Sequence, residues 1–154
     1  MPKNPFLAGK IILGSETDAG IYTYDGNDVI DYSGNTINTV YAATATADGL
    51  TTGLIPENTN FVSVTSGNAD HIVTLPTGTA GQIINVYVGA NGCEMRTPAA
   101  SGATINNVDS DGTNELALAA TTSYICTCVA TDTWIVRGFT NLGADAAALV
   151  PDTA

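Results

Sequence analysis

The chain has 154 residues, of which 44% are hydrophobic and only 12% are charged, a composition typical of one globular domain and not of a disordered chain. Fifteen Asp and Glu residues against four Lys and Arg residues give a formal net charge of -11. This balance disfavours binding to nucleic-acid phosphates and to anionic membranes. No apolar run reaches the roughly 18 residues of a membrane-spanning helix.

Residues 1–20 predict an N-terminal arm with apolar and basic side chains. The first residues, Met1–Pro5, lack the long apolar core of a signal peptide, so we expect a protein made in a cytoplasm. A small domain needs no apolar arm beyond its own core, so the arm suits either a clamp on a neighbouring subunit or a first strand. The arm residues that are candidates for docking or self-association are Lys3, Phe6, Leu7, Lys10, Ile11, Ile12 and Leu13.

Residues 21–58 predict a β-rich region followed by a linker or long loop. Tyr22 and Tyr24 lie two apart, so on a strand their side chains face the same way. The pair fits sheet packing, and it is also a candidate self-association surface because tyrosine is enriched at interface hot spots. The low-complexity stretch 42–58 separates this region from a compact β-domain at 59–140.

The segment 11–137 has the composition of strands and turns. No long stretch repeats apolar residues at helical spacing, whereas Thr, Val, Ile, Gly and Asn are abundant. Short apolar runs separated by turn signals such as Asn91-Gly92 predict an all-β fold, with a β-sandwich or jelly-roll-like body. The predicted strands are Ile11–Leu13, Ile21–Tyr24, Val29–Tyr32, Thr36–Tyr41, Phe61–Val64, Ile72–Leu75, Ile83–Val88, Leu116–Leu118, Tyr124–Val129 and Trp134–Val136.

Side-chain alternation predicts which sides of the later strands are buried. In 83–88 the even-numbered residues form an apolar face, whereas the odd-numbered face is mixed and is expected to be half-buried. The sole tryptophan, Trp134, is expected to anchor the core of a terminal hairpin. Cys126 and Cys128 lie two apart in an apolar run, which predicts one shared, buried face. The Ala-rich residues 141–154 predict a short C-terminal tail, either loose or as a short helix.

Catalytic and metal patterns are weak. Asp70-His71 is accompanied by no Gly-x-Ser-x-Gly nucleophile motif, and the chain has no phosphate-binding glycine pattern. Three cysteines without a framework do not predict a disulfide-stapled module. A Cys-x-Cys metal site would need two further ligands. We therefore expect no enzymatic activity, no metal and no cofactor.

One acidic loop is a weak calcium candidate. Asn107, Asp109 and Asp111 place oxygen ligands at alternate positions, and Gly112 follows them, as in the first half of a calcium loop. Leu118 stands where that pattern requires a bidentate glutamate. An acidic hairpin turn is the favoured alternative.

The compact region contains motifs in a definite order. A strand ending in Leu75-Pro76 precedes the strand 83–88; a Gly-rich turn, the segment 102–106 and a terminal Trp134 strand follow. Over residues 60–137 this order resembles small β-domains of tailed-bacteriophage virion structural proteins, most closely capsid decoration (cement) proteins. The matching residues make turns and core, so the resemblance implies an architecture and a structural role, and no catalytic residues.

The resemblance implies a virion structural protein that is made in the host cytoplasm, lies on the capsid exterior and stabilises the assembled head. Its expected partners are copies of itself, with a homotrimer favoured, and the major capsid protein, without nucleic acid or membrane. The alternative is a tail-fibre or receptor-binding accessory protein that recognises host-surface glycan. A tryptophan inside a strand, instead of at a loop tip, disfavours that alternative.

Overall fold

The computed structural model describes residues 40–98, 102–109, 114–146 and 149–153, together with the backbone of 21–22 and 28–30. The chain divides into two units, Met1–Asn38 and Thr39–Ala154. In the first unit, β1 (Ile21–Tyr22) pairs antiparallel with β2 (Asp28–Ile30). The described residues contain no helix, so the all-β prediction is confirmed for them. Among these residues no helical segment is long and apolar enough to cross a membrane.

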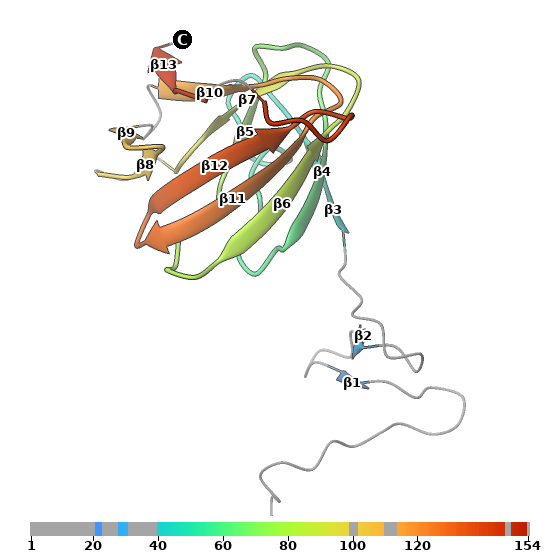
Figure 1. Ribbon diagram of the computed structural model, residues 1–154, viewed down its shortest axis with the longest axis vertical. Helices are drawn as coiled ribbons and strands as arrows, with labels where there is room; N and C mark the ends of the chain where they lie inside the picture. Colours follow the sequence, from blue (N-terminus) through green and yellow to red (C-terminus); the bar gives the residue numbers. More distant parts are fainter. Residues whose placement is uncertain are drawn as a thin grey trace, which may run out of the picture. The chain divides into compact units, whose positions relative to one another are not determined.

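The second unit contains a seven-stranded mixed sheet in the order β3-β4-β6-β11-β12-β8-β9. In Figure 1 its five longest strands, β3, β4, β6, β11 and β12, run side by side as one broad layer. The strands are β3 (Val40–Thr44), β4 (Phe61–Thr65), β6 (Ile83–Val88), β11 (Ser123–Ala130), β12 (Thr133–Phe139), β8 (Thr104–Ile105) and β9 (Val108–Asp109).

A four-stranded mixed sheet forms the second layer, in the order β13-β10-β7-β5. In Figure 1 the strands β5, β7 and β10 lie behind the broad layer. The short β13 comes from the predicted C-terminal tail and extends this sheet beyond β10. The strands are β5 (Ile72–Thr74), β7 (Cys93–Arg96), β10 (Asn114–Leu118) and β13 (Asp152–Thr153).

From β3 to β7 the chain passes back and forth between the two layers. The strand β4 returns parallel to β3, and β6 returns parallel to β4, with β5 of the other sheet between them in sequence. Likewise β7 lies parallel to β5 after β6 has been added to the first sheet. The direction then reverses, because β10 and β11 run antiparallel to β7 and β6. The mixed sheets therefore result from this alternate winding.

One apolar core lies between the two sheets. Along each strand alternate side chains point inward, as the burial of Val62 and Val64 on β4 and of Ile84, Val86 and Val88 on β6 shows. The second sheet contributes inward residues from β5, β7 and β10 to the same cluster. The largest fully buried side chain is Trp134 on β12, so its predicted role as a core anchor is confirmed.

The strands that the sequence did not predict are short, and one of them, β7, alternates apolar and charged residues. In β7 the buried Cys93 and Met95 alternate with Glu94 and Arg96, so no apolar run marks the strand. The hairpin β8–β9 turns through Asn106 and Asn107, both at positive φ (51° and 66°), the conformation that a two-residue type I′ turn requires. By contrast, the terminal hairpin β11–β12 lies where sequence predicts it.

Asn106 connects this small hairpin to the rest of the second unit. Its side-chain oxygen accepts a hydrogen bond from Val136 N at 2.9 Å. Its side-chain nitrogen donates to Val136 O at 3.2 Å and to Leu149 O at 2.9 Å. A single half-buried amide thus connects the short β8 strand, β12 and the segment that leads to β13.

The stretch 42–58, predicted as a linker or long loop, begins in β3, reaches β5 of the four-stranded sheet and returns to β4, and it places side chains in the core. Ala45 and Ile55 are buried within it, and its backbone forms bridges to β5 at Thr46 and Leu54. Gly49 adopts φ 63°, and a Cβ atom there would lie 2.6 Å from the Ile72 side chain. The close approach to β5 therefore requires glycine at this position.

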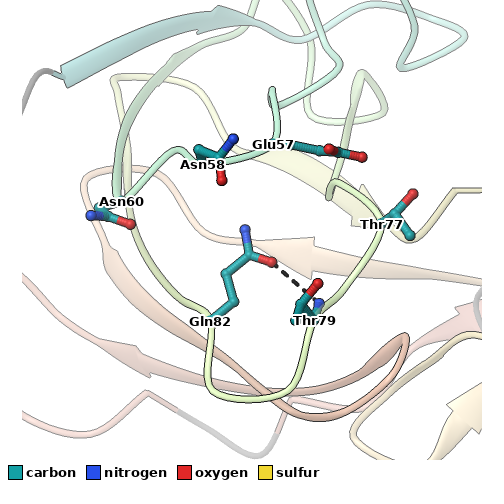
Figure 2. A pocket seen from close by; sticks show the side chains of 6 residues that line it. All are labelled: Glu57, Asn58, Asn60, Thr77, Thr79 and Gln82. Atoms are coloured by element: carbon teal, nitrogen blue, oxygen red, sulfur yellow. Dashed lines mark hydrogen bonds between the residues drawn. The ribbon is translucent and has the colours of Figure 1, made fainter. Parts of the chain in front are cut away.

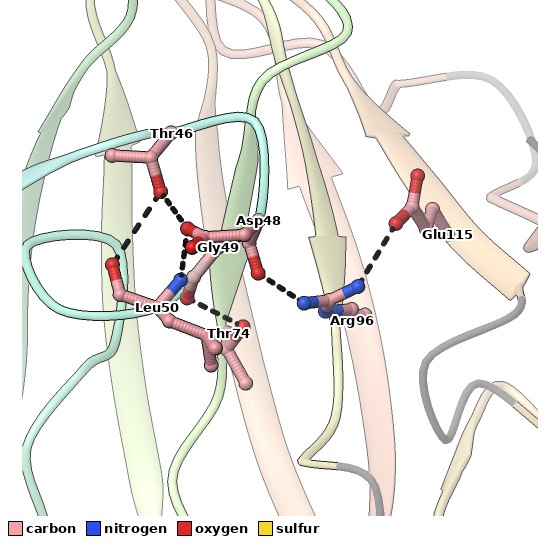
Figure 3. Close-up of polar contacts among 7 residues, drawn as sticks. All are labelled: Thr46, Asp48, Gly49, Leu50, Thr74, Arg96 and Glu115. Atoms are coloured by element: carbon pink, nitrogen blue, oxygen red, sulfur yellow. Dashed lines mark hydrogen bonds and ion pairs between the residues drawn. The ribbon is translucent and has the colours of Figure 1, made fainter.

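Polar contacts hold this crossover loop against the four-stranded sheet (Figure 3). Asp48 accepts hydrogen bonds from Thr46 Oγ1 at 2.8 Å and Leu50 N at 3.0 Å, and these contacts lower the pKa of its carboxyl group. The Arg96 guanidinium donates to the backbone oxygen of Asp48 and lies 3.6 Å from the Glu115 carboxylate. Arg96 therefore links the loop, β7 and β10.

Replacing Trp134 with alanine is expected to lower the free energy of unfolding by about 3–5 kcal/mol, because a fully buried aromatic side chain leaves a cavity. The matched control is Ile135→Ala on the same strand, whose half-buried side chain should contribute less than about 1 kcal/mol. Urea denaturation of both variants checks this. Equal losses for the two would contradict the assigned core.

Candidate functional site

The outer face of the seven-stranded sheet is the most apolar exposed surface of the described residues. We use the term outer face for the side of β3, β4, β6, β11 and β12 that points away from the core. The most exposed of its large apolar side chains are Val40 (57%), Val129 (55%), Ile83 (49%) and Tyr87 (47%). The other large apolar members are Phe61, Ile125, Ile135 and Phe139.

Strand register makes these side chains contiguous. One row across the sheet runs Val40, Phe61, Asn85, Ile125 and Arg137, because each residue is paired with the next. Directly paired side chains on one face lie about 5 Å apart, within contact of each other. Five strands about 4.8 Å apart make the face about 20 Å wide.

A second row and a third complete the outer face. Tyr87 pairs with Ser63 and Ser123 on its two neighbouring strands, and Ser123 pairs in turn with Phe139. Thr127 lies between Ile83 and Ile135. Small polar residues thus separate the larger apolar ones and leave shallow hollows between them.

Two such hollows meet on the outer face. One has a volume of about 480 Å³ and is lined by Val40, Phe61 and Tyr87 among others. The other, about 360 Å³, is lined by Val129 and Ile135. Ile125 and Phe139 border both. The face is therefore grooved and largely apolar, the surface character of a binding site for another macromolecule.

The outer face differs in charge from the rest of the chain. Among the outward positions of its five strands there is no carboxylate, and Arg137 is the one residue with a formal charge. The outer side of the four-stranded sheet instead carries Glu94, Arg96 and Asp152. In a protein with a net charge of -11, this contrast makes the outer face distinct.

A carboxylate pair lies on the four-stranded sheet. Glu94 shares a hydrogen bond with Glu115, which together with burial and the nearby charges of Glu115, Asp70 and Asp152 raises the pKa of Glu94 from 4.5 to about 7. Glu115 is buried and also faces Arg96 at 3.6 Å. A hydrogen bond between two carboxyl groups requires that one of them be protonated.

A polar hollow of about 370 Å³ lies where two loops lead into β4 and β6 (Figure 2). Its side chains carry amide, hydroxyl and carboxylate groups. Thr79 N donates to Gln82 Oε1 at 3.4 Å, and the loop before β4 is bonded to β6 because Asn85 N donates to Asn60 O at 2.8 Å. The lining residues are Glu57, Asn58, Asn60, Thr77, Thr79 and Gln82.

The cysteines are all buried and carry free thiols. Cys126 and Cys128 both point inward from β11, so the predicted shared, buried face is confirmed. Burial raises the pKa of the Cys93 and Cys126 thiols to about 12. These residues are packing groups and not nucleophiles at neutral pH.

Most site residues predicted from sequence lie outside the described residues. This holds for the arm candidates from Lys3 to Leu13, for Tyr24 and for Asp111. Tyr22 lies on β1, where only the backbone is described. Of the weak calcium candidates, Asn107 lies exposed at the β8–β9 turn and Asp109 contributes backbone to β9. No metal-ligating cluster of three or more His, Cys, Asp or Glu occurs among the described residues.

Sequence reasoning did not find the outer face as a site. A signal for this surface was present in 83–88, because the odd-numbered side of that strand combines apolar and polar side chains. Phe61, Ile125 and Ile135 continue that pattern on other strands, but only the register brings them together.

Comparison of the chain with protein-family models, with curated proteins and with solved structures found no match.

The glutamate pair generates a pH prediction. Because folded Glu94 holds a proton that the unfolded chain releases near pH 4.5, the free energy of unfolding should fall as the pH rises from 4.5 to about 7. Glu94→Gln keeps a hydrogen-bond donor for Glu115 and cannot ionise, so it should raise the melting temperature at pH 8 and change it little at pH 4.5. Thermal melts at both pH values measure this, with the exposed loop variant Glu57→Gln as control. A parallel pH dependence in wild type and Glu94→Gln would contradict the assignment.

Proposed function

We propose that this chain is a non-enzymatic structural protein of a tailed-bacteriophage particle, a capsid decoration (cement) protein that lies on the capsid exterior and stabilises the assembled head. The observation that carries the proposal is the outer face, because a grooved apolar surface without carboxylates is suited to macromolecular contact. The order of motifs over residues 60–137 supports the phage assignment.

The fold can be specified further within this proposal. A jelly roll is built from antiparallel strands, whereas β3, β4 and β6 run parallel to one another here. We therefore favour a β-sandwich body over a jelly roll, with residues 1–20 as the arm that reaches the capsid. Lys3 and Lys10 would attract the arm to an acidic capsid surface, and its apolar residues, Phe6 to Leu13, would then bind.

The stabilising effect follows from mass action. A protein that binds only the assembled shell lowers the free energy of that state in proportion to RT ln(1 + [L]/Kd). The major capsid protein and other copies of this chain are the expected partners, with a homotrimer favoured. The protein would be made in the host cytoplasm and bind neither nucleic acid nor membrane, in keeping with its net charge of -11.

Deletion of residues 1–13 tests the arm. The core cluster lies between Ala43 and Val136, so the truncated chain should stay folded by circular dichroism and thermal melting. It should lose binding to phage particles from the same source in a co-sedimentation assay. A chain in which 1–13 is replaced by a Gly-Ser segment of equal length is the matched control and should also fail to bind. Full retention of both variants on particles would contradict the arm's role.

A second candidate function is recognition of host-surface glycan by a tail-fibre or receptor-binding accessory protein. The polar hollow favours it, because amide and hydroxyl groups are suited to hydrogen bonding with sugar hydroxyls. Trp134 is fully buried, so it offers no stacking surface to a sugar.

The two functions make opposite predictions for sugar binding and for location. The glycan function predicts saturation-transfer NMR signals from neutral mono- and disaccharides that are lost in Asn60→Ala, with the loop variant Leu142→Ala as control. The decoration function predicts no such signals. It also predicts that a gold-labelled antibody against this protein binds to the heads of the phage particles. Labelling confined to tails, together with Asn60-dependent sugar binding, would replace the decoration function with the second one.

A further inference from the structure

We propose that the outer face is the surface through which copies of this chain associate, so that the outer face of one copy is covered by one or two other copies. The inference deepens the proposed structural function, on which it rests, by naming the surface and the partner. It assigns self-association to Val40, Phe61, Ile83, Tyr87, Ile125 and Val129, which are exposed in one copy, and so locates it on the folded body.

The charge distribution favours the outer face for contact between two copies. Two chains that each carry a net charge of -11 repel each other, and contact through the four-stranded sheet would bring Glu94 and Asp152 of both copies together. Contact through the outer face brings no carboxylate of its five strands into the interface. It is therefore the described sheet face on which two acidic copies can meet without burying like charges.

Arg137 fits this arrangement because of its position in the sheet. It lies on β12, four strands away from Val40 on β3 in the same row. In a ring of copies the β12 side of one face meets the β3 side of the next. Each Arg137 then lies near the apolar β3 side of its neighbour and not opposite another Arg137. At that position its aliphatic stem can cover apolar surface.

The size and relief of the face are suited to a compact interface. It is about 20 Å wide and about 20 Å long, since the seven residues from Ser123 to Val129 rise about 3.3 Å each. This corresponds to roughly 400 Å² in projection, within the range of apolar patches that mark interaction sites. A standard interface buries about 800 Å² per partner, so the outer face supplies its apolar core and the margins supply a polar rim. The two hollows beside Ile125 and Phe139 provide space for protruding side chains of the other copy.

The test is the mass of the purified full-length chain by light scattering and sedimentation velocity over a wide range of protein concentration. We expect an assembly of two or three chains that persists in 1 M NaCl (about 3 Å Debye length) because apolar contact is not screened by salt. Ile125→Lys and Tyr87→Lys, both at exposed outward positions, should each shift the mass to that of a single chain while the circular-dichroism spectrum stays unchanged.

Two controls separate the outer face from general effects of added charge. Ala117→Lys places a lysine at an exposed strand position of the four-stranded sheet, and Leu142→Lys replaces a 91% exposed leucine in a loop. Both should keep the assembly of the wild type.

A wild type that is a single chain at every concentration would overturn the inference, as would an assembly retained in both outer-face variants or dissolved by salt. Binding to phage particles, measured in parallel, distinguishes this failure from failure of the proposed function. A single chain that still binds particles would contradict self-association and support the decoration function. A chain that assembles but does not bind particles would support self-association and contradict the decoration function.

Discussion

The structure depends on one constraint: two sheets must bury their inward side chains in a single core. The five-residue β4 and the eight-residue β11 supply two and three inward side chains, too few to form a core alone. The chain meets the constraint by passing from one sheet to the other between β4 and β7, so these strands are added to the two sheets in turn. The reversal at β10 and β11 then closes the second unit around Trp134.

The same constraint explains why polar contacts concentrate where the chain changes layer. The crossover loop between β3 and β4 is held to β7 and β10 through the Arg96 contacts with Asp48 and Glu115. Asn106 has a similar role for β8, β12 and the C-terminal segment. Both side chains form hydrogen bonds with backbone groups of neighbouring segments. Polar groups near a core usually need such partners.

Packing also determines how the two outer sides differ. Inward positions are apolar on both sheets, so the distinction between the sheets lies in the outward positions. The four-stranded sheet carries outward charged groups, among them Glu94, whose pKa is raised by its hydrogen bond to Glu115, and Arg96. The seven-stranded sheet carries Ile83, Ile125 and Val129 outward, a composition that leaves apolar surface in water. Under the proposed self-association, this apolar surface is covered by other copies of the chain.

The sequence by itself determined the all-β class, most of the long strands, the terminal hairpin, and the burial of Trp134, Cys126 and Cys128, because period-two alternation and turn residues are local signals. It did not reveal β7, whose Glu94 and Arg96 interrupt the apolar pattern, nor β8 and β13, which are two residues long. Only the tertiary structure decided which strands run parallel, that Ala45 and Ile55 of the crossover loop pack into the core, and that Phe61, Tyr87 and Ile125 form one surface. These features depend on strand register between segments distant in sequence, and no local pattern encodes that register.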